Sequence, residues 1–184
     1  MVRMISVSVF LVLFLVSVGF GEQEAPKIGD QASSFYLKTL EGKDFFLRDY
    51  CGELRPPVIK KKQHVVVLSF FATWCGPCKR EIPHLEKIYK RYKSKDVKVV
   101  LIDVEEKPPK VSEFLKELQV DLPVLIDRYA AVKQRYGIES LPTLFLIGKE
   151  GKIRDIRIGY KEGDEEEVEK EIQEILAETG SKVR

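Results

Sequence analysis

The chain has 184 residues, of which 44% are hydrophobic, so it can bury the core of one ordinary domain without stapling cross-links. Its 31 basic and 29 acidic residues leave a formal net charge of only +2. Nucleic-acid-binding proteins usually carry a clustered basic excess, so this balance predicts no nucleic-acid partner.

Residues 1–21 have the pattern of an export leader. Arg3 precedes an uncharged apolar stretch that ends at Gly21 and is followed by acidic sequence. The stretch resembles a signal peptide, and it is also long enough to span a bilayer. The cation before it places the rest of the chain outside the cytoplasm in either case. We therefore predict a signal peptide or N-terminal membrane anchor at 1–21 and one domain at 22–184. The protein is expected to be exported, either periplasmic or anchored to the cytoplasmic membrane and facing outward.

Beyond the leader, strand and helix patterns alternate, which predicts an α/β domain. Short apolar runs at 35–37 and 45–47 flank Glu41-Gly42-Lys43 and predict a β-hairpin. The segment 53–64, with its prolines and lysines, predicts an exposed loop. The apolar run 65–71 then predicts a central strand.

A long helix is expected after this strand, with a kink at Pro83 and an apolar face formed by Ile82, Leu85, Ile88, Tyr89 and Tyr92. The next elements predicted are a strand at 97–104, a helix after Pro108-Pro109, a strand at 124–126, a helix at about 129–136, and hairpin strands at 143–147 and 153–158. Asp164 is predicted to cap the last helix with Glu167 as its capping partner.

The segment Trp74-Cys75-Gly76-Pro77-Cys78 directly follows the predicted central strand and points to dithiol redox chemistry. At a strand-to-helix junction, the first sulfur lies over unpaired N–H groups and the positive end of the helix dipole, which stabilises its thiolate. Cys75 is therefore the predicted nucleophile. Cys78, within the first helical turn, can close a disulfide and is the predicted resolving thiol. Half of a zinc site is the alternative, but the sequence has no second Cys or His pair at comparable spacing, so we predict no metal.

Several separated motifs together resemble the TlpA/ResA-like thiol-disulfide oxidoreductases, a membrane-associated family of the thioredoxin superfamily. The segment 71–78 matches the family's active site, Glu81-Ile82-Pro83 matches the Glu-x-Pro that follows it, and Leu141-Pro142-Thr143 matches the cis-proline loop. The resemblance covers about residues 27–178. It implies an α/β thioredoxin fold with an N-terminal β-hairpin before residue 50 and a central strand-helix insertion between residues 97 and 122.

The resemblance also implies a proton acceptor near the cysteines. Ser69 stands where similar thioredoxins carry a buried Asp, and a hydroxyl cannot act as the base near neutral pH. Glu81, one turn beyond Cys78, is then the remaining candidate for a catalytic acid or base. The alternative for Glu81 is an ordinary solvated charge on a helix.

Substrate contacts are implied on both sides of the cysteines. A cis bond before Pro142 would expose the backbone of Leu141, with Thr143 beside it, for strand-like pairing with a polypeptide. Gly76 and Pro77 lie between the two cysteines. Trp74 favours a flat apolar docking surface, with simple packing as its alternative role.

The function implied is thiol-disulfide exchange on exported proteins, as a monomeric reductase that needs no bound cofactor. Family members often reduce the haem-binding cysteines of apocytochrome c and receive electrons from an integral-membrane thiol carrier, so cytochrome c maturation is the expected role. A disulfide oxidase or isomerase would use the same residues. A peroxiredoxin-type peroxidase would need Thr where Ala72 stands, and a copper-binding assembly protein would use Cys75, Cys78 and His64.

The remaining cysteine and the two histidines have ordinary alternatives. Cys51 is a candidate for a third redox thiol or an intermolecular bridge, but we favour a small buried side chain. His64 and His84 are isolated in the sequence, so structural or surface roles are expected for both.

Overall fold

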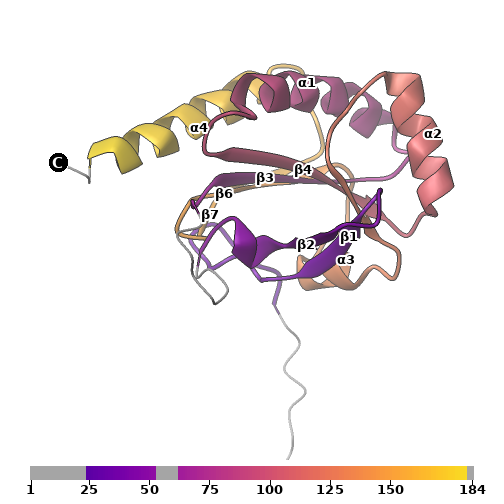
Figure 1. Ribbon diagram of the computed structural model, residues 1–184, viewed down its shortest axis with the longest axis horizontal. Helices are drawn as coiled ribbons and strands as arrows, with labels where there is room; N and C mark the ends of the chain where they lie inside the picture. The colour runs from indigo at the N-terminus through magenta and orange to yellow at the C-terminus, as the bar shows by residue number, and fades with distance from the viewer. Residues whose placement is uncertain (1–23, 53–61, 182–184) are drawn as a thin grey trace, which may run out of the picture.

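Seven strands form one mixed sheet, and Figure 1 shows it with helices on both faces. The computed structural model describes residues 24–52 and 62–181. The predicted leader and residues 53–61 of the predicted loop lie outside the described residues.

In chain order the elements are β1 (Tyr36–Thr39), β2 (Asp44–Phe46), the 3-10 helix η1 (Leu47–Asp49), β3 (Val65–Phe71), α1 (Gly76–Tyr92), β4 (Val97–Val104), α2 (Pro108–Leu118), β5 (Val124–Asp127), α3 (Ala131–Arg135), β6 (Thr143–Ile147), β7 (Ile153–Ile158) and α4 (Asp164–Ser181). The strands lie in the order β2-β1-β5-β4-β3-β6-β7. β3, β4 and β5 are parallel neighbours, whereas the other pairings are antiparallel.

The N-terminal hairpin β1–β2 is joined to the rest of the sheet by β5, which pairs with β1 on one side and β4 on the other. The strand and helix expected between residues 97 and 122 are β4 and α2, which follow α1 in the chain. The arrangement is therefore the α/β sheet with an added hairpin and a strand-helix insertion that the sequence predicts.

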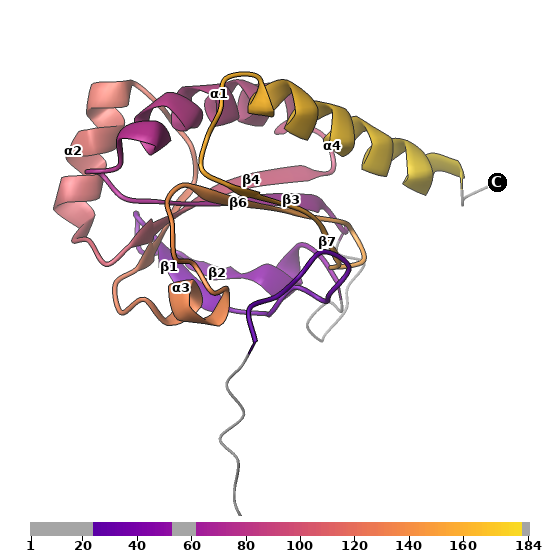
Figure 2. The same ribbon diagram turned by 180° about the vertical axis from the view of Figure 1, so that it is seen from behind.

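Two apolar layers sandwich the sheet. Helices α1, α2 and α4 cover one face. Helix α3 and the segment that precedes β1, with Ala32 and Phe35, cover the other (Figures 1 and 2). Residues along a strand point alternately to its two faces, so β3 serves both layers. Val67 and Phe71 face α1, and Leu68 and Phe70 face α3. Every residue of β3 is buried, as expected for a central strand covered on both faces.

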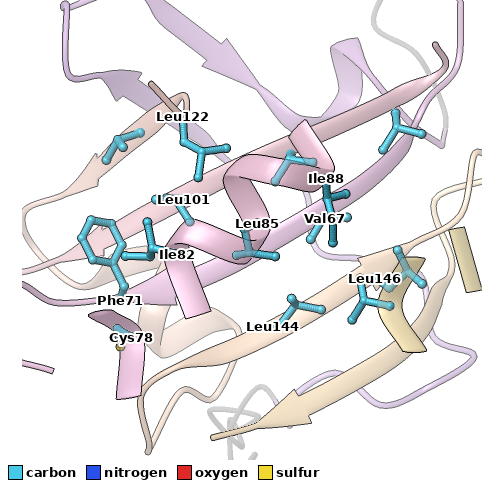
Figure 3. Close-up of a cluster of buried hydrophobic side chains, with 14 of the residues drawn as sticks. Val67, Phe71, Cys78, Ile82, Leu85, Ile88, Leu101, Leu122, Leu144 and Leu146 are labelled. Carbon is cyan, nitrogen blue, oxygen red and sulfur yellow. The ribbon is translucent and has the colours of Figure 1, made fainter. Parts of the chain in front are cut away.

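Helix α1 starts at the active-site segment and is held by its apolar stripe. Pro77 lies in its first turn, where the missing N–H of proline costs no helical hydrogen bond. The helix continues through Pro83 as far as Tyr92. Figure 3 shows how its buried residues meet β3, β4 and β6, through Ile82, Leu85 and Ile88 on the helix and Val67, Leu101 and Leu144 on the strands. The sheet therefore fixes the position of the cysteine segment.

Helix α3 is shorter than the predicted span of 129–136. Ala130 has a left-handed backbone with φ 55°, so the helix begins only at Ala131. The carboxylate of Asp127 accepts the N–H groups of Val132 and Lys133 at 2.9 and 2.7 Å. This side-chain cap comes from the end of β5, and it sets a later start than the apolar pattern suggested.

The predicted capping box of α4 is wrong. The backbone N–H groups of Glu166 and Glu167 donate to the carbonyl of Gly163, not to the side chain of Asp164. Asp164 instead accepts the N–H of Lys161 at 2.6 Å, within the preceding turn. The Glu167 carboxylate accepts a hydrogen bond from the guanidinium of Arg157 at 2.8 Å. A tertiary ion pair therefore replaces the local cap.

Candidate active site

Cys75 and Cys78 form a disulfide where β3 leads into α1, with their Cα atoms 5.3 Å apart. Cys75 is 3% exposed and Cys78 is fully buried. Cys75 is the N-cap of α1, and its sulfur accepts the N–H of Cys78 at 3.2 Å. The sulfur of the first cysteine thus lies at the helix N-terminus, where the N–H donors and the dipole favour a thiolate after reduction.

Trp74 is the large apolar group exposed beside the disulfide. Its side chain is 71% exposed although both neighbouring cysteines are buried. It lines a cleft of about 750 Å³ together with Val104, Ile138 and Leu141. Gly76 is exposed and Pro77 half-buried in the first turn of α1, so both add surface next to Trp74. The exposure of Trp74 is compatible with the predicted docking surface, which stays a prediction.

The loop before β6 reaches the same end of the sheet. The Leu141–Pro142 peptide bond is cis, as predicted. Thr143 begins β6 directly opposite Phe70 of β3, one residue from the end of that strand, so sheet register places Pro142 beside the approach to the cysteines. The hydroxyl of Thr143 donates to the carbonyl of Ser140 at 2.7 Å, which fixes the loop, and Leu141 lines the Trp74 cleft.

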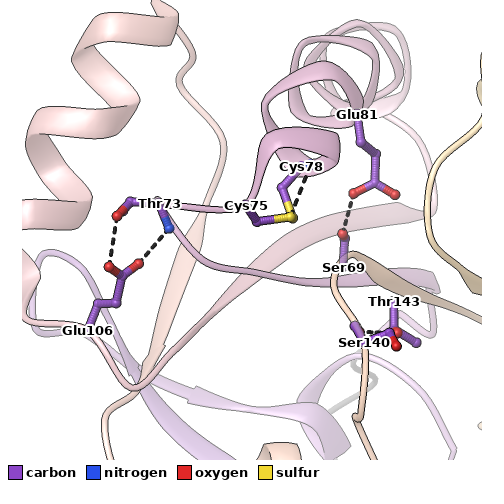
Figure 4. Close-up of a disulfide and its surroundings, with 8 residues drawn as sticks. All are labelled: Ser69, Thr73, Cys75, Cys78, Glu81, Glu106, Ser140 and Thr143. Carbon is purple, nitrogen blue, oxygen red and sulfur yellow. Dashed lines mark hydrogen bonds between the residues drawn. A yellow bond between two sulfur atoms is a disulfide. The ribbon is translucent and has the colours of Figure 1, made fainter.

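Glu81 is buried, so its alternative role as a solvated helix charge is wrong. The residue is 5% exposed, and its carboxylate accepts the hydroxyl of Ser69 at 2.6 Å (Figure 4). Burial raises the pKa of Glu81 and the nearby Asp164 adds to the shift, whereas the Ser69 hydrogen bond opposes it, and the resulting pKa is about 7. Glu81 can therefore hold or release a proton near neutral pH, one turn from Cys78.

Glu106 and Asp103 form a buried acidic pair near the disulfide that the sequence patterns did not predict. Glu106 is 8% exposed and accepts hydrogen bonds from both the backbone N–H and the hydroxyl of Thr73, on the opposite side of the disulfide from Glu81 in Figure 4. Asp103, fully buried, accepts the N–H of Glu106 at 3.2 Å. The sequence does hold a signal for this pair. Asp103 and Glu106 lie at the end of the predicted strand 97–104, and the carboxyl ends of parallel strands meet at one edge of the sheet, close to the cysteines.

Cys51 lies away from this site and is buried, 4% exposed. Burial raises the pKa of its thiol to about 12, with a further contribution from Glu150. Both properties confirm the expectation of a small buried side chain. His84 pairs with Glu165 at 2.9 Å, and His64 packs edge-on against Tyr50. Across residues 24–52 and 62–181, no three His, Cys, Asp or Glu side chains gather as metal ligands.

The sequence of this chain is similar to a known protein family and to individual members of it. The Redoxin family model matches residues 27–172. The thiol-disulfide oxidoreductase ResA of Bacillus cereus is 36% identical over 134 residues, which cover 73% of this chain and 71% of the relative. ResA of Geobacillus thermodenitrificans is 34% identical over 164 residues, covering 85% of this chain and 88% of the relative.

Solved structures give the same fold. A Chlorobium tepidum protein assigned as the thiol:disulfide interchange protein DsbE superimposes with a TM-score of 0.71 at 30% identity, covering 83% of this chain and 99% of its own. StoA of Bacillus subtilis superimposes with a TM-score of 0.57 at 28% identity, covering 73% and 95%. The predicted thioredoxin-like fold is confirmed. Within the described residues, no helix has the length and apolar character needed to cross a membrane.

Proposed function

Since the chain belongs to the Redoxin family and is a thiol-disulfide oxidoreductase similar to ResA, we propose that it works as a reductase of disulfides in exported proteins. The observation that carries the proposal is the placement of Cys75 at the N-terminus of α1 with Cys78 in bonding position behind it. In the reduced enzyme, the Cys75 thiolate attacks a substrate disulfide and forms a mixed disulfide, and one substrate sulfur leaves as a thiolate.

Cys78 then completes the exchange. Its thiolate attacks the sulfur of Cys75, which releases the reduced substrate and leaves the Cys75–Cys78 disulfide. Two electrons have passed from the enzyme to the substrate. In this scheme Glu81 takes the proton that Cys78 loses, because its pKa of about 7 suits transfer near neutral pH and Ser69 offers only a hydroxyl.

The direction of electron flow is supported by the residues between the cysteines. Gly76 and Pro77 are the pair found in thioredoxin, whose potential is about −270 mV, whereas the oxidant DsbA has about −120 mV. The difference is about 7 kcal/mol for two electrons. The dipeptide therefore favours donation of electrons to substrates.

Substrate binding is proposed along the cleft beside the disulfide. Trp74 and Leu141 offer apolar surface there, and the backbone around Pro142 and Thr143 lies beside the end of β3. A polypeptide that pairs with this backbone gains affinity without a strict sequence requirement. Such a site suits a reductase with several clients.

The leader pattern at 1–21 supports export, either to the periplasm or on a membrane anchor facing outward. An enzyme outside the cytoplasm needs an electron donor, for which we propose an integral-membrane thiol carrier. The proposed physiological substrate is a disulfide between the haem-binding cysteines of apocytochrome c, which makes cytochrome c maturation the proposed role. Disulfide oxidation or isomerisation is the alternative.

The midpoint potential of the Cys75/Cys78 couple tests the direction. We expect a value near or below that of thioredoxin, about −270 mV, whereas a value near −120 mV would replace the reductase with an oxidase. A peptide with a Cys-x-x-Cys-His disulfide, the haem-attachment motif, tests the substrate. It should be reduced faster than the same peptide with scrambled spacing, and equal rates would remove apocytochrome c from the proposal.

A further inference from the structure

The turn before the reactive cysteine is tied to a carboxylate from another strand. Thr73, two residues before Cys75, donates its backbone N–H to one oxygen of Glu106 at 2.5 Å and its hydroxyl to the other at 2.7 Å (Figure 4). Hydrogen bonds to a carboxylate are stronger than neutral ones. The Cys75 N–H donates to the carbonyl of Ala72 at 3.1 Å, so Thr73 lies within the same tight turn as the nucleophile.

Glu106 reaches this turn through an unusual backbone. Phe71 pairs with Asp103 in the parallel ladder of β3 and β4, so both strands end at the same edge. Glu105 follows with φ 68°, a left-handed conformation that costs a residue other than glycine about 1 kcal/mol or more. Its N–H donates to the carbonyl of Asp127 at 3.2 Å. Strain of this kind persists where the surrounding structure requires it, and here it precedes the carboxylate that binds Thr73.

The charge on Glu106 is supported from both sides. Burial alone would raise the pKa of Glu106, but hydrogen bonds from Lys110 and Thr73 outweigh burial and lower it. Burial raises the pKa of Asp103, the Glu106 charge adds to the shift and Lys110 opposes it, and the resulting pKa is about 8. Among the described residues, Asp103 Oδ1 has no hydrogen-bond partner. The two shifts have opposite directions, so the negative charge of the pair is favoured on Glu106, the residue that binds Thr73.

We propose that Glu106 is a positioning residue for Cys75, because its carboxylate fixes the Thr73 turn and thereby the direction from which the nucleophile and Trp74 meet a substrate disulfide. Sulfur attack requires the three sulfur atoms to be aligned, and small displacements of a catalytic group lower rates strongly. Glu106 touches neither sulfur and takes no proton from them. The role concerns exchange at Cys75, so it holds whether the enzyme reduces or oxidises its clients.

The test removes the Thr73–Glu106 bonds one at a time in the reduced protein. Glu106→Gln keeps the shape but has a single acceptor oxygen, and Thr73→Val removes only the hydroxyl. Oxidised glutathione is the probe, and the fluorescence of Trp74, the single tryptophan of the sequence, reports oxidation. At a pH where Cys75 is fully thiolate, both variants should react about 10-fold or more slowly than the parent. Thr73→Ser, which restores the hydroxyl, should recover the parent rate.

The control is Glu113→Gln, which removes the same charge from an exposed position on α2 and should leave the rate unchanged. A role through charge alone would instead lower the Cys75 pKa in Glu106→Gln, measured by alkylation against pH, without slowing the fully ionised thiolate. That result, or a parent rate in Thr73→Val, would overturn the proposal. If Glu106→Gln does not fold, the comparison of Thr73→Val with Thr73→Ser decides. The midpoint potential is not used, so failure of the reductase proposal leaves this test intact.

Discussion

Glu81→Gln should make the protein more stable at alkaline pH, because the parent must ionise a buried carboxyl there. Glutamine has nearly the shape of protonated glutamic acid and keeps a hydrogen-bonding partner for Ser69. Below about pH 4.5, where Glu81 is protonated in both the folded and unfolded states, parent and variant should therefore have similar free energies of unfolding.

The magnitude follows from the shifted pKa. Folding raises the pKa of Glu81 from 4.5 to about 7, so between these values the folded state binds more protons than the unfolded state. Stability of the parent therefore falls as pH rises through this window and levels off above it. A shift of this size corresponds to about 3 kcal/mol, with no large correction for solvent because the side chain is only 5% exposed. The Glu81→Gln variant has no carboxyl group to ionise, so its free energy of unfolding does not fall in this way.

The measurement is guanidinium unfolding of the oxidised parent and variant from pH 4 to pH 8.5. In the disulfide form, Cys75 and Cys78 cannot titrate, and the difference between the two proteins cancels the contribution of Asp103. We expect the curves to meet at low pH and to separate by about 3 kcal/mol at pH 8. Parallel curves across the whole range would refute the claim that Glu81 is a buried acid with a raised pKa.

Three other outcomes are expected. Cys78→Ser should accumulate mixed disulfides at Cys75, which peptide mapping would locate; attachment mainly at Cys51 would reverse the assignment of the nucleophile. Cys51→Ala should keep the parent exchange rate, since its thiol is buried with a pKa of about 12, and a slowed enzyme would make it a third redox thiol. Arg157→Met should lower the free energy of unfolding by about 2 kcal/mol, because its side chain is 15% exposed and joins β7 to α4 through several carboxylates. Lys27→Met, at an exposed ion pair, should cause no measurable change, and equal losses would contradict the role of burial.

The cysteine segment was predictable because its determinants are local. An apolar run predicts the strand, and the spacing of Cys75 and Cys78 predicts a disulfide in the first helical turn. The burial of Glu81 has a signal in the spacing of the helix. Glu81 lies three residues after Cys78 and four before Leu85, so all three share the buried stripe of α1.

The Thr73–Glu106 contact had no local signal. The two residues are 33 positions apart, and they meet only because β3 and β4 are parallel neighbours in one register. The same reason explains the error at α4, where the Glu167 carboxylate binds Arg157 on β7 and not its own helix. Periodicity identifies elements, but contacts between strand ends depend on which strands become neighbours.

Both edges of the sheet discourage aggregation with other chains. One edge strand, β2, has only three residues, and the other, β7, carries Arg154, Asp155 and Arg157 with their ion pairs. Short or charged edge strands resist the addition of a foreign strand. An enzyme that pairs with polypeptide segments of exported proteins, as we propose, exposes its own sheet edges to strands of those clients. Because its edge strands are short or charged, the enzyme can bind such clients repeatedly without co-aggregating with them.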